Sequence, residues 1–217
     1  MTYTIVCYGD SNTHGADPST DRRLPREVRW PGVMRAVLGD SYEVIEEGLN
    51  GRTTVWDTPL APYHNGNTYL MPCLLSHEPV DLVIIMLGTN DLKRIHDLTA
   101  PEIASGASVL VDVARRSLTG PGGLPPAVLL VAPVPLGEPT DASELWGLGA
   151  AREESEKLAR LYREGARQDE VAFFDAGTVA AVSPDDGVHL DAAAHAGLGR
   201  AMAGEVRAVL AGVDRSQ

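Results

Sequence analysis

The sequence lacks long apolar runs and is poor in cysteine. None of its apolar stretches reaches the roughly 18 residues that a membrane-spanning helix needs. The N-terminal residues MTYTIVCYGD have neither the basic region nor the apolar core of a signal peptide, so we expect a cytoplasmic protein. Cys7 and Cys73 are the only cysteines, and they make neither a disulfide framework nor a zinc-ligand spacing. We therefore predict a protein without a metal centre.

Basic residues are also scarce. The chain has 18 Lys and Arg against 30 Asp and Glu, a net charge of -12, and no basic stripe. Such a chain repels nucleic-acid backbones and anionic lipid at long range, so we expect neither nucleic acid nor a membrane as a partner. The hydrophobic share of 44 % and the charged share of 22 % are ordinary for a globular protein and exclude a disordered chain. The length predicts one domain over residues 1–217.

Apolar runs of strand length recur along the chain and alternate with helix-like segments. The runs are near-continuous, which is typical of strands buried on both faces of a parallel sheet. Strands are predicted at residues 4–8, 42–45, 82–87, 127–131 and 171–174. Helices are predicted at residues 30–38, 101–117, 143–168 and 191–210, the last with Asp191 as its cap. This alternation predicts a doubly wound α/β fold with helices on both faces of the sheet.

Two long segments, residues 16–29 and 53–72, are predicted to be irregular. Each follows the carboxyl end of a predicted strand, or the short turn after it. Open α/β sheets bind their ligands at that edge, and long irregular loops are often functional. Both segments are therefore candidate walls of a pocket, although for the first a disordered surface loop is nearly as good an interpretation.

Four polar motifs follow predicted strands. The first, Gly9-Asp10-Ser11-Asn12, places a serine directly after the first strand. A backbone N–H at a helix N-terminus favours a developing anion, so this position suits a nucleophile. The alternative is structural, because Asp and Ser are good helix caps and Gly eases a turn.

A serine nucleophile needs a base, and the sequence offers Asp186-Gly187-Val188-His189 before the last predicted helix. An aspartate that accepts from one imidazole nitrogen leaves the other free to take the serine proton. The alternative is an ordinary loop with a capping or packing histidine. His195 is a competing base, but its place inside an Ala-rich helix favours a packing role.

Donors for an oxyanion are present after two further strands. Gly51, in Asn50-Gly51, leaves its backbone N–H accessible, and Asn90, in Gly88-Thr89-Asn90-Asp91, carries a side-chain amide. Taken singly, each motif is an ordinary turn former. Together, the four motifs supply every group that one acyl-transfer mechanism requires.

This set of motifs, in this order, resembles the SGNH (GDSL-type) hydrolase family over nearly the whole chain. The longer stretches EEGLNGRTT (46–54) and LVIIMLGTND (82–91) are similar to its arylesterase/acyltransferase branch. The resemblance implies a flavodoxin-like three-layer α/β/α sandwich around a five-stranded parallel sheet of order 2-1-3-4-5. It also implies a serine esterase that cleaves short acyl esters without a cofactor and in some members transfers the acyl group to alcohols.

Carried over to this sequence, the resemblance implies Ser11 as nucleophile, His189 as base and Asp186 as the group that orients it. The N–H of Ser11, the N–H of Gly51 and the side chain of Asn90 would form the oxyanion hole. The partner would be a small-molecule ester, and members of the branch often form homo-oligomers.

Substrate contacts are less constrained by the motifs. We expect Asp10, Asn12, His14 and Trp56 to line the substrate pocket. For Trp56 and its apolar neighbours in the loop, a self-packed loop or a subunit contact is an open alternative. Two other functions also stay open: a carbohydrate O-deacetylase of the same family, and a non-catalytic ligand-binding module of the same fold.

Overall fold

A computed structural model describes residues 2–20, 22–59 and 61–212. Within them, five strands form one sheet of order β2-β1-β3-β4-β5, and every neighbouring pair is parallel. The strands are β1 (Tyr3–Gly9), β2 (Tyr42–Gly48), β3 (Leu82–Met86), β4 (Ala127–Ala132) and β5 (Ala172–Asp175). The predicted fold, its five strands and their order are confirmed.

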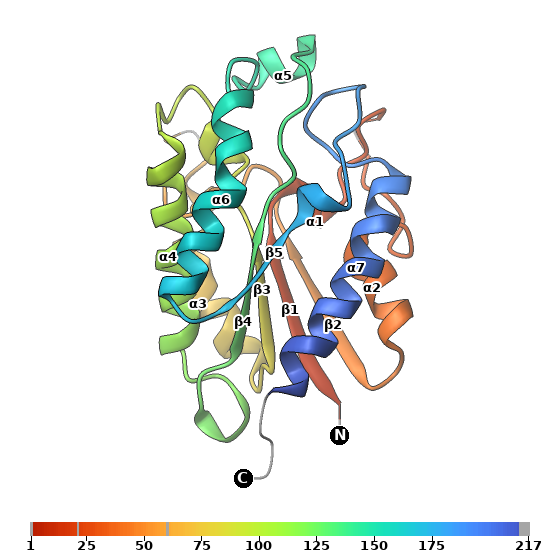
Figure 1. The fold of residues 1–217 in the computed structure, drawn as a ribbon, viewed down its shortest axis with the longest axis vertical. Coiled ribbons are helices and arrows are strands. Elements are labelled where there is room, and N and C mark those ends of the chain that lie inside the picture. Colours follow the sequence, from red (N-terminus) through yellow and green to blue (C-terminus); the bar gives the residue numbers. More distant parts are fainter. Residues whose placement is uncertain (1, 21, 60, 213–217) are drawn as a thin grey trace.

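Helices cover both faces of the sheet, so the molecule has three layers (Figure 1). On one face lie α2 (Trp30–Leu38) and α7 (Ala192–Ala211), and on the other lie α3 (Gly66–His77), α4 (Ala100–Arg116) and α6 (Arg152–Gln168). Two short helices, α1 (Ser11–His14) and α5 (Asp141–Leu145), lie at the carboxyl edge of the sheet. Single 3-10 turns occur at Pro62–His64, Asn90–Leu92, Pro121–Gly123 and Ala176–Thr178.

The near-continuous apolar strands follow from this layering. Successive side chains of a strand point to opposite faces of the sheet. In β1, Ile5 and Cys7 therefore pack under α2 and α7, whereas Val6 and Tyr8 pack under α3, α4 and α6. All four side chains are fully buried. No helix in the described part of the chain is long and apolar enough to cross a membrane.

The structure corrects the prediction that residues 53–72 are irregular throughout. Helix α3 begins at Gly66, with Asn65 as its N-cap, and continues through Pro72. The helix was not predicted, because the sequence has a proline in its interior and only a weak amphipathic pattern. Buried Leu70, Cys73 and Leu74 nevertheless recur at helical spacing and hold it against the sheet.

The helix predicted over residues 143–168 is two helices. Gly147 lies between α5 and α6 with a φ of 77°, a left-handed conformation that interrupts any helix there. The helices predicted at 30–38, 101–117 and 191–210 are confirmed to within one residue at each end. Asp191 caps α7 as expected, its carboxylate accepting from the N–H of Ala194 at 2.7 Å.

Helices α2 and α7 pack closely because Gly199 of α7 has no side chain. A Cβ at this position would lie 2.6 Å from the carbonyl oxygen of Trp30 and 2.7 Å from Cβ of Val33. At Gly204, one and a half turns further along the same helix, a Cβ would meet nothing within 4 Å.

We therefore expect the same substitution to have opposite effects at the two glycines. Gly199→Ala should lower the free energy of unfolding by about 1–3 kcal/mol, because it forces the two helices apart. Gly204→Ala should raise it by about 0.5–1 kcal/mol through helix propensity. Urea denaturation followed by circular dichroism measures both. Equal effects of the two substitutions would contradict the close approach of α2 and α7.

Candidate active site

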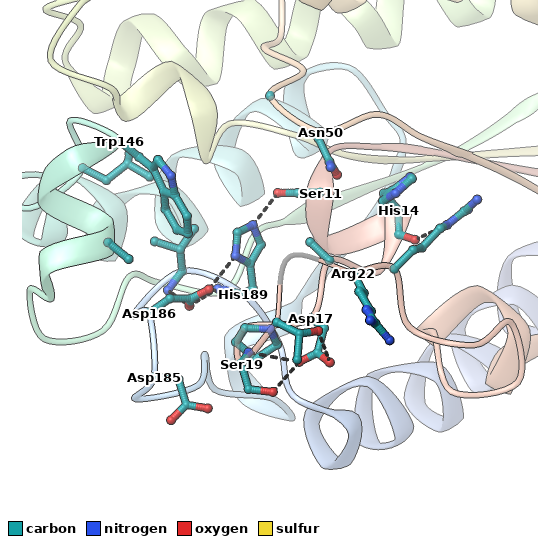
Figure 2. A pocket seen from close by; sticks show the side chains of 18 of the residues that line it. Ser11, His14, Asp17, Ser19, Arg22, Asn50, Trp146, Asp185, Asp186 and His189 are labelled. Carbon is teal, nitrogen blue, oxygen red and sulfur yellow. Dashed lines mark hydrogen bonds and ion pairs between the residues drawn. The ribbon is translucent and has the colours of Figure 1, made fainter.

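A cavity of about 550 Å³ lies at the carboxyl edge of the sheet (Figure 2). Segments that follow all five strands contribute to its wall. Ser11 comes after β1, Gly51 after β2, Asn90 after β3 and His189 from the loop between β5 and α7. Parallel strands end at a common edge, so residues far apart in sequence meet here.

Three of the predicted residues form a continuous chain of contacts. His189 Nε2 lies 2.9 Å from Ser11 Oγ, and His189 Nδ1 lies 2.6 Å from Asp186 Oδ2. A carboxylate on Nδ1 holds the proton on that nitrogen, so Nε2 is left as an acceptor facing the hydroxyl. Figure 2 shows the three side chains in this order.

The loop around Asp186 fixes its carboxylate firmly. The second oxygen, Oδ1, accepts from the backbone N–H groups of Val188 and His189, each at 2.8 Å. Burial alone would raise the pKa of Asp186, but the hydrogen bonds from His189 and Val188 outweigh it and hold the pKa below its usual value. The group is therefore an anion at neutral pH.

The side chain of Asn12 links the turn that carries Ser11 to the loop that carries His189. Its side-chain Nδ2 donates to the carbonyl of Val188 at 3.1 Å, and its Oδ1 accepts from the N–H of Leu190 at 3.0 Å. These hydrogen bonds fix the backbone on both sides of His189. Since Asn12 is next to Ser11 in the chain, they set the distance between the hydroxyl and the imidazole.

This geometry corrects the expectation that Asp10 and Asn12 line the pocket. Both side chains are buried, with 1 % and 5 % of their surface exposed, and neither is among the described residues of the cavity wall. Asp10 instead caps α1, where its carboxylate accepts from the N–H of Asn12 at 2.9 Å. Residue type and position next to the serine did not reveal which way these side chains point.

The two expected oxyanion donors lie in the wall of the same cavity as Ser11. Gly51 has a φ of 80°, which only glycine adopts readily. Asn90 donates through Nδ2 to the carbonyl of Arg52 at 3.1 Å, so its amide is held beside the Gly51 turn. Asp91 adds a second tie, because it accepts from both the N–H and the hydroxyl of Thr54.

The outer wall of the cavity is mostly polar, and it comes from the segment that follows α1. Its residues include Asp17, Ser19, Thr20, Arg22 and Arg23. Of residues 16–29, the candidate wall segment, residues 16–20, 22 and 23 line the cavity, and Asp21 lies outside the described residues. His14 also lines the cavity, as expected.

Trp56, which was expected to line the substrate pocket, lies elsewhere. Trp56 is not among the described residues of the cavity wall, and its carbonyl accepts from Thr53 Oγ1 at 2.6 Å within its own loop. Trp146 of the turn after α5 lines the cavity instead, with its ring edge-on to His189 at 5.3 Å between centroids. Trp146 was not predicted as a site residue, because an aromatic side chain alone does not distinguish a substrate contact from a subunit contact.

His195, the competing base, has a structural place. It is fully buried in α7, and its Nδ1 accepts from the N–H of Trp30 at 3.2 Å at the start of α2. Burial lowers the pKa of His195 to about 4, so it stays neutral.

Comparison with known proteins agrees with the geometry. The model of the GDSL-like lipase/acylhydrolase family matches residues 7–196. The chain belongs to this family. It is thus a carboxylic-ester hydrolase of the GDSL type. A search of curated proteins found no match.

Solved structures include several similar GDSL hydrolases. An aryl esterase from M. smegmatis is 42 % identical with a TM-score of 0.91, and the match covers 96 % of this chain and 100 % of that one. A carbohydrate acetylesterase from Sinorhizobium meliloti is 43 % identical with a TM-score of 0.90, covering 95 % and 99 %. The fold and the family are therefore established together.

The buried carboxyl group of Asp91 should make the stability of this GDSL hydrolase depend on pH. Burial raises its pKa to about 6, against the opposing hydrogen bonds from Thr54 and with some help from the charge of Asp10. The folded protein then binds a proton between about pH 4 and 6 that the unfolded chain has lost. The contribution of Asp91 to stability therefore falls as the pH rises through that range.

Asp91→Asn should remove this dependence. The variant will be less stable than wild type at pH 4, and that deficit should shrink by up to about 3 kcal/mol by pH 7. Urea denaturation at both pH values measures the difference, with the exposed Asp112→Asn as the control for loss of a carboxylate. A deficit that stays constant with pH would show that Asp91 is not a buried, protonatable group.

Proposed function

We propose that the protein is a serine esterase in which Ser11, His189 and Asp186 act as a catalytic triad. The observation that supports this most directly is the contact chain of 2.9 Å and 2.6 Å at the wall of the cavity. Ser11 Oγ attacks the ester carbonyl carbon as its proton passes to His189 Nε2. Asp186 orients the imidazole and stabilises its cationic form.

The tetrahedral oxyanion would lie among the N–H of Ser11, the N–H of Gly51 and the side-chain amide of Asn90. Support comes from the placement of all three residues around one cavity. One such donor typically lowers the barrier by about 3 kcal/mol. The C–O bond to the alcohol then breaks, and the alcohol takes the proton from His189. Water attacks the acyl-enzyme in the same way and restores the serine.

The substrate we propose is a short-chain acyl ester of an aryl or alkyl alcohol. Its support is the likeness to the aryl esterase and the edge of Trp146 beside His189, which offers an apolar contact for a small group. Transfer of the acyl group to an alcohol is part of this proposal, because an alcohol that reaches the acyl-enzyme can replace water. His14, at the cavity wall, would contact either group.

A carbohydrate O-deacetylase is the second candidate, and a specific observation favours it. The outer wall presents Asp17, Ser19, Thr20, Arg22 and Arg23, which are groups that hydrogen-bond to hydroxyls. One of the similar structures is a carbohydrate acetylesterase. A deacetylase would perform the same chemistry at Ser11 but bind the sugar through this polar rim.

We also keep three broader proposals. The chain acts as one domain, because both apolar clusters pack on a single sheet. It works in the cytoplasm, which the two free buried cysteines favour. It self-associates, for which the support is exposed apolar side chains, Leu145 at 84 % and Tyr63 at 66 %.

The triad proposal predicts that Ser11→Ala abolishes esterase activity. We expect kcat on p-nitrophenyl acetate to fall by about 10⁴-fold or more, because the nucleophile is gone while binding remains. Ser19→Ala is the matched control, since Ser19 lines the same cavity without contacting His189. Covalent labelling with a fluorophosphonate should follow the same pattern. Labelling that survives in Ser11→Ala would reject Ser11 as the nucleophile, whereas wild-type protein that is not labelled would favour the ligand-binding module.

Substrate choice is tested by chain length and by the rim. If the substrate is a small acyl ester, kcat/KM should fall from p-nitrophenyl acetate through butyrate to octanoate, and Arg22→Ala should change these values less than about threefold. If it is an acetylated sugar, Arg22→Ala should instead raise KM for acetylated xylo-oligosaccharide about tenfold and leave p-nitrophenyl acetate unaffected. Parallel steady-state assays on the same two proteins separate the two candidates.

A further inference from the structure

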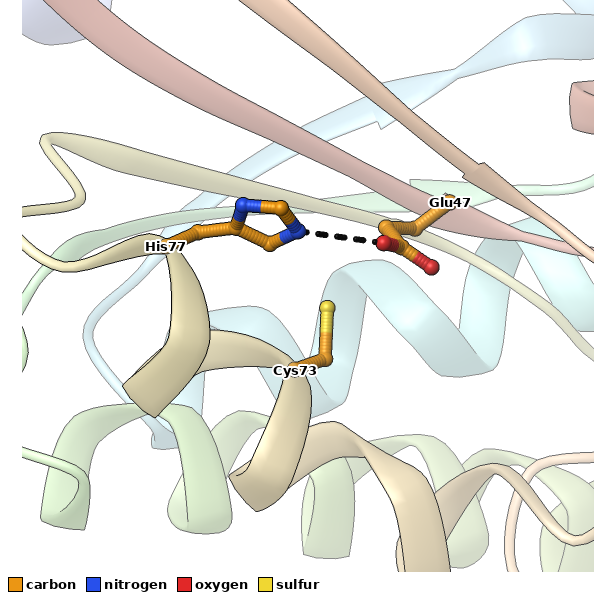
Figure 3. A group of neighbouring side chains, drawn as sticks. All are labelled: Glu47, Cys73 and His77. Carbon is orange, nitrogen blue, oxygen red and sulfur yellow. Dashed lines mark hydrogen bonds and ion pairs between the residues drawn. The ribbon is translucent and has the colours of Figure 1, made fainter.

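A second cluster of reactive side chains lies away from the cavity, between β2 and α3 (Figure 3). It consists of Glu47, Cys73 and His77, and none of them is among the described residues of the cavity wall. We propose that these three residues form a binding site for a divalent transition-metal cation of the Zn²⁺ class. The proposal does not depend on the esterase mechanism.

The positions of the three residues follow from the secondary structure. Cys73 and His77 are four residues apart on α3, so their side chains lie on the same face of the helix. Glu47 of β2 is paired with Tyr8 of β1, whose side chain faces the same layer of helices. The carboxylate therefore meets the thiol and the imidazole between the sheet and α3.

The donor atoms are already close together. His77 Nε2 lies 3.2 Å from Glu47 Oε1, and the three donor atoms are all within 4.8 Å of one another. A tetrahedral zinc ion with bonds of about 2.0–2.3 Å places its ligands about 3.3–3.8 Å apart. Side-chain adjustments of about 1 Å, without movement of the backbone, would complete that geometry.

The set of donors matches the cation. Sulfur, imidazole nitrogen and carboxylate oxygen are the three ligand types of zinc, and three protein ligands leave one position for water. Cys73 is fully buried, whereas the side chains of His77 and Glu47 are 31 % and 20 % exposed. The cation can therefore enter from solvent on the side of His77 and Glu47 and meet the thiol at the inner end.

The charges also balance. Cys73 is fully buried, so it is a neutral thiol before the metal binds. Binding breaks the S–H bond, the sulfur pair bonds to the metal and the proton leaves to the buffer. Thiolate and carboxylate then carry two negative charges against the two positive charges of the ion.

The neighbouring guanidinium of Arg52 does not occupy the carboxylate of Glu47. Arg52 lies over the ring of Tyr8, 4.1 Å from its centroid, and its Nη1 donates to the carbonyl oxygens of Gly9 and Glu47. These contacts engage the backbone of Glu47, while its carboxylate contacts His77. The alternative explanation is a plain Glu–His ion pair beside a buried packing cysteine, and it predicts no metal binding.

Cobalt binding to the whole protein tests the proposal. Protein freed of metal with EDTA and kept reduced is titrated with Co²⁺, and the thiolate-to-cobalt charge-transfer absorption in the near ultraviolet is recorded. We expect one Co²⁺ per chain with this absorption, and displacement by one equivalent of Zn²⁺. Wild-type protein without a thiolate band, or with a band that Zn²⁺ does not remove, overturns the proposal.

Variants identify the ligands. Cys73→Ser should lose the charge-transfer band, although Cys7 is still present, and His77→Gln should weaken Co²⁺ binding by more than about tenfold. Glu47→Gln, which keeps the shape of a partly exposed side chain, should weaken it similarly and covers the case that Cys73→Ser does not fold. His96→Gln is the control that removes a histidine outside the cluster. Equal binding by Glu47→Gln and wild type, or an equal loss in His96→Gln, would refute the assignment.

Discussion

The site depends on the two hydrogen bonds between the side chain of Asn12 and the backbone on either side of His189. Ser11 and His189 are separated by 178 positions, yet their side chains must stay within hydrogen-bond distance. Two buried hydrogen bonds from one amide, to Val188 and Leu190, join the turn after β1 to the loop before α7. Buried bonds of this kind are costly to leave half-made, so the two segments hold each other in one arrangement.

The same principle extends across the sheet edge. Asn90 binds the carbonyl of Arg52, and Asp91 binds Thr54, so the segment after β3 fixes the segment after β2. Each tie leaves a polar or charged group buried, which opposes folding unless its partners are in place. The raised pKa of Asp91 is the direct sign of that cost. Part of the stability of the fold is thus exchanged for a fixed geometry, in which the proposed oxyanion donors Gly51 and Asn90 would need no rearrangement when charge develops.

The sequence predicted what depends on pattern and motif, and it failed where the direction of a side chain decides. Strands buried on both faces produce apolar runs, so β1 to β5 could be predicted, and the family resemblance implied their order. Helix α3 could not, because Pro72 and a weak apolar stripe conceal it. Ser11, Asp186, His189, Gly51 and Asn90 came together because strand ends share an edge. Asn12 and Trp56 were misplaced because proximity along the chain does not show which side of the loop faces the cavity.

The groups proposed for chemistry and the residues at the cavity rim lie on different kinds of segment, and this difference affects substrate choice. The groups proposed for chemistry lie on strand ends and short turns held by buried hydrogen bonds. The cavity rim instead comes from partly or fully exposed segments, residues 16–20, 22 and 23 and the turn carrying Trp146. Exposed loops tolerate substitution far better than buried ties. Related enzymes can therefore differ in the alcohol they accept while the acyl-transfer geometry stays constant. An aryl esterase and a carbohydrate acetylesterase that both resemble this chain are the outcome expected of such an arrangement.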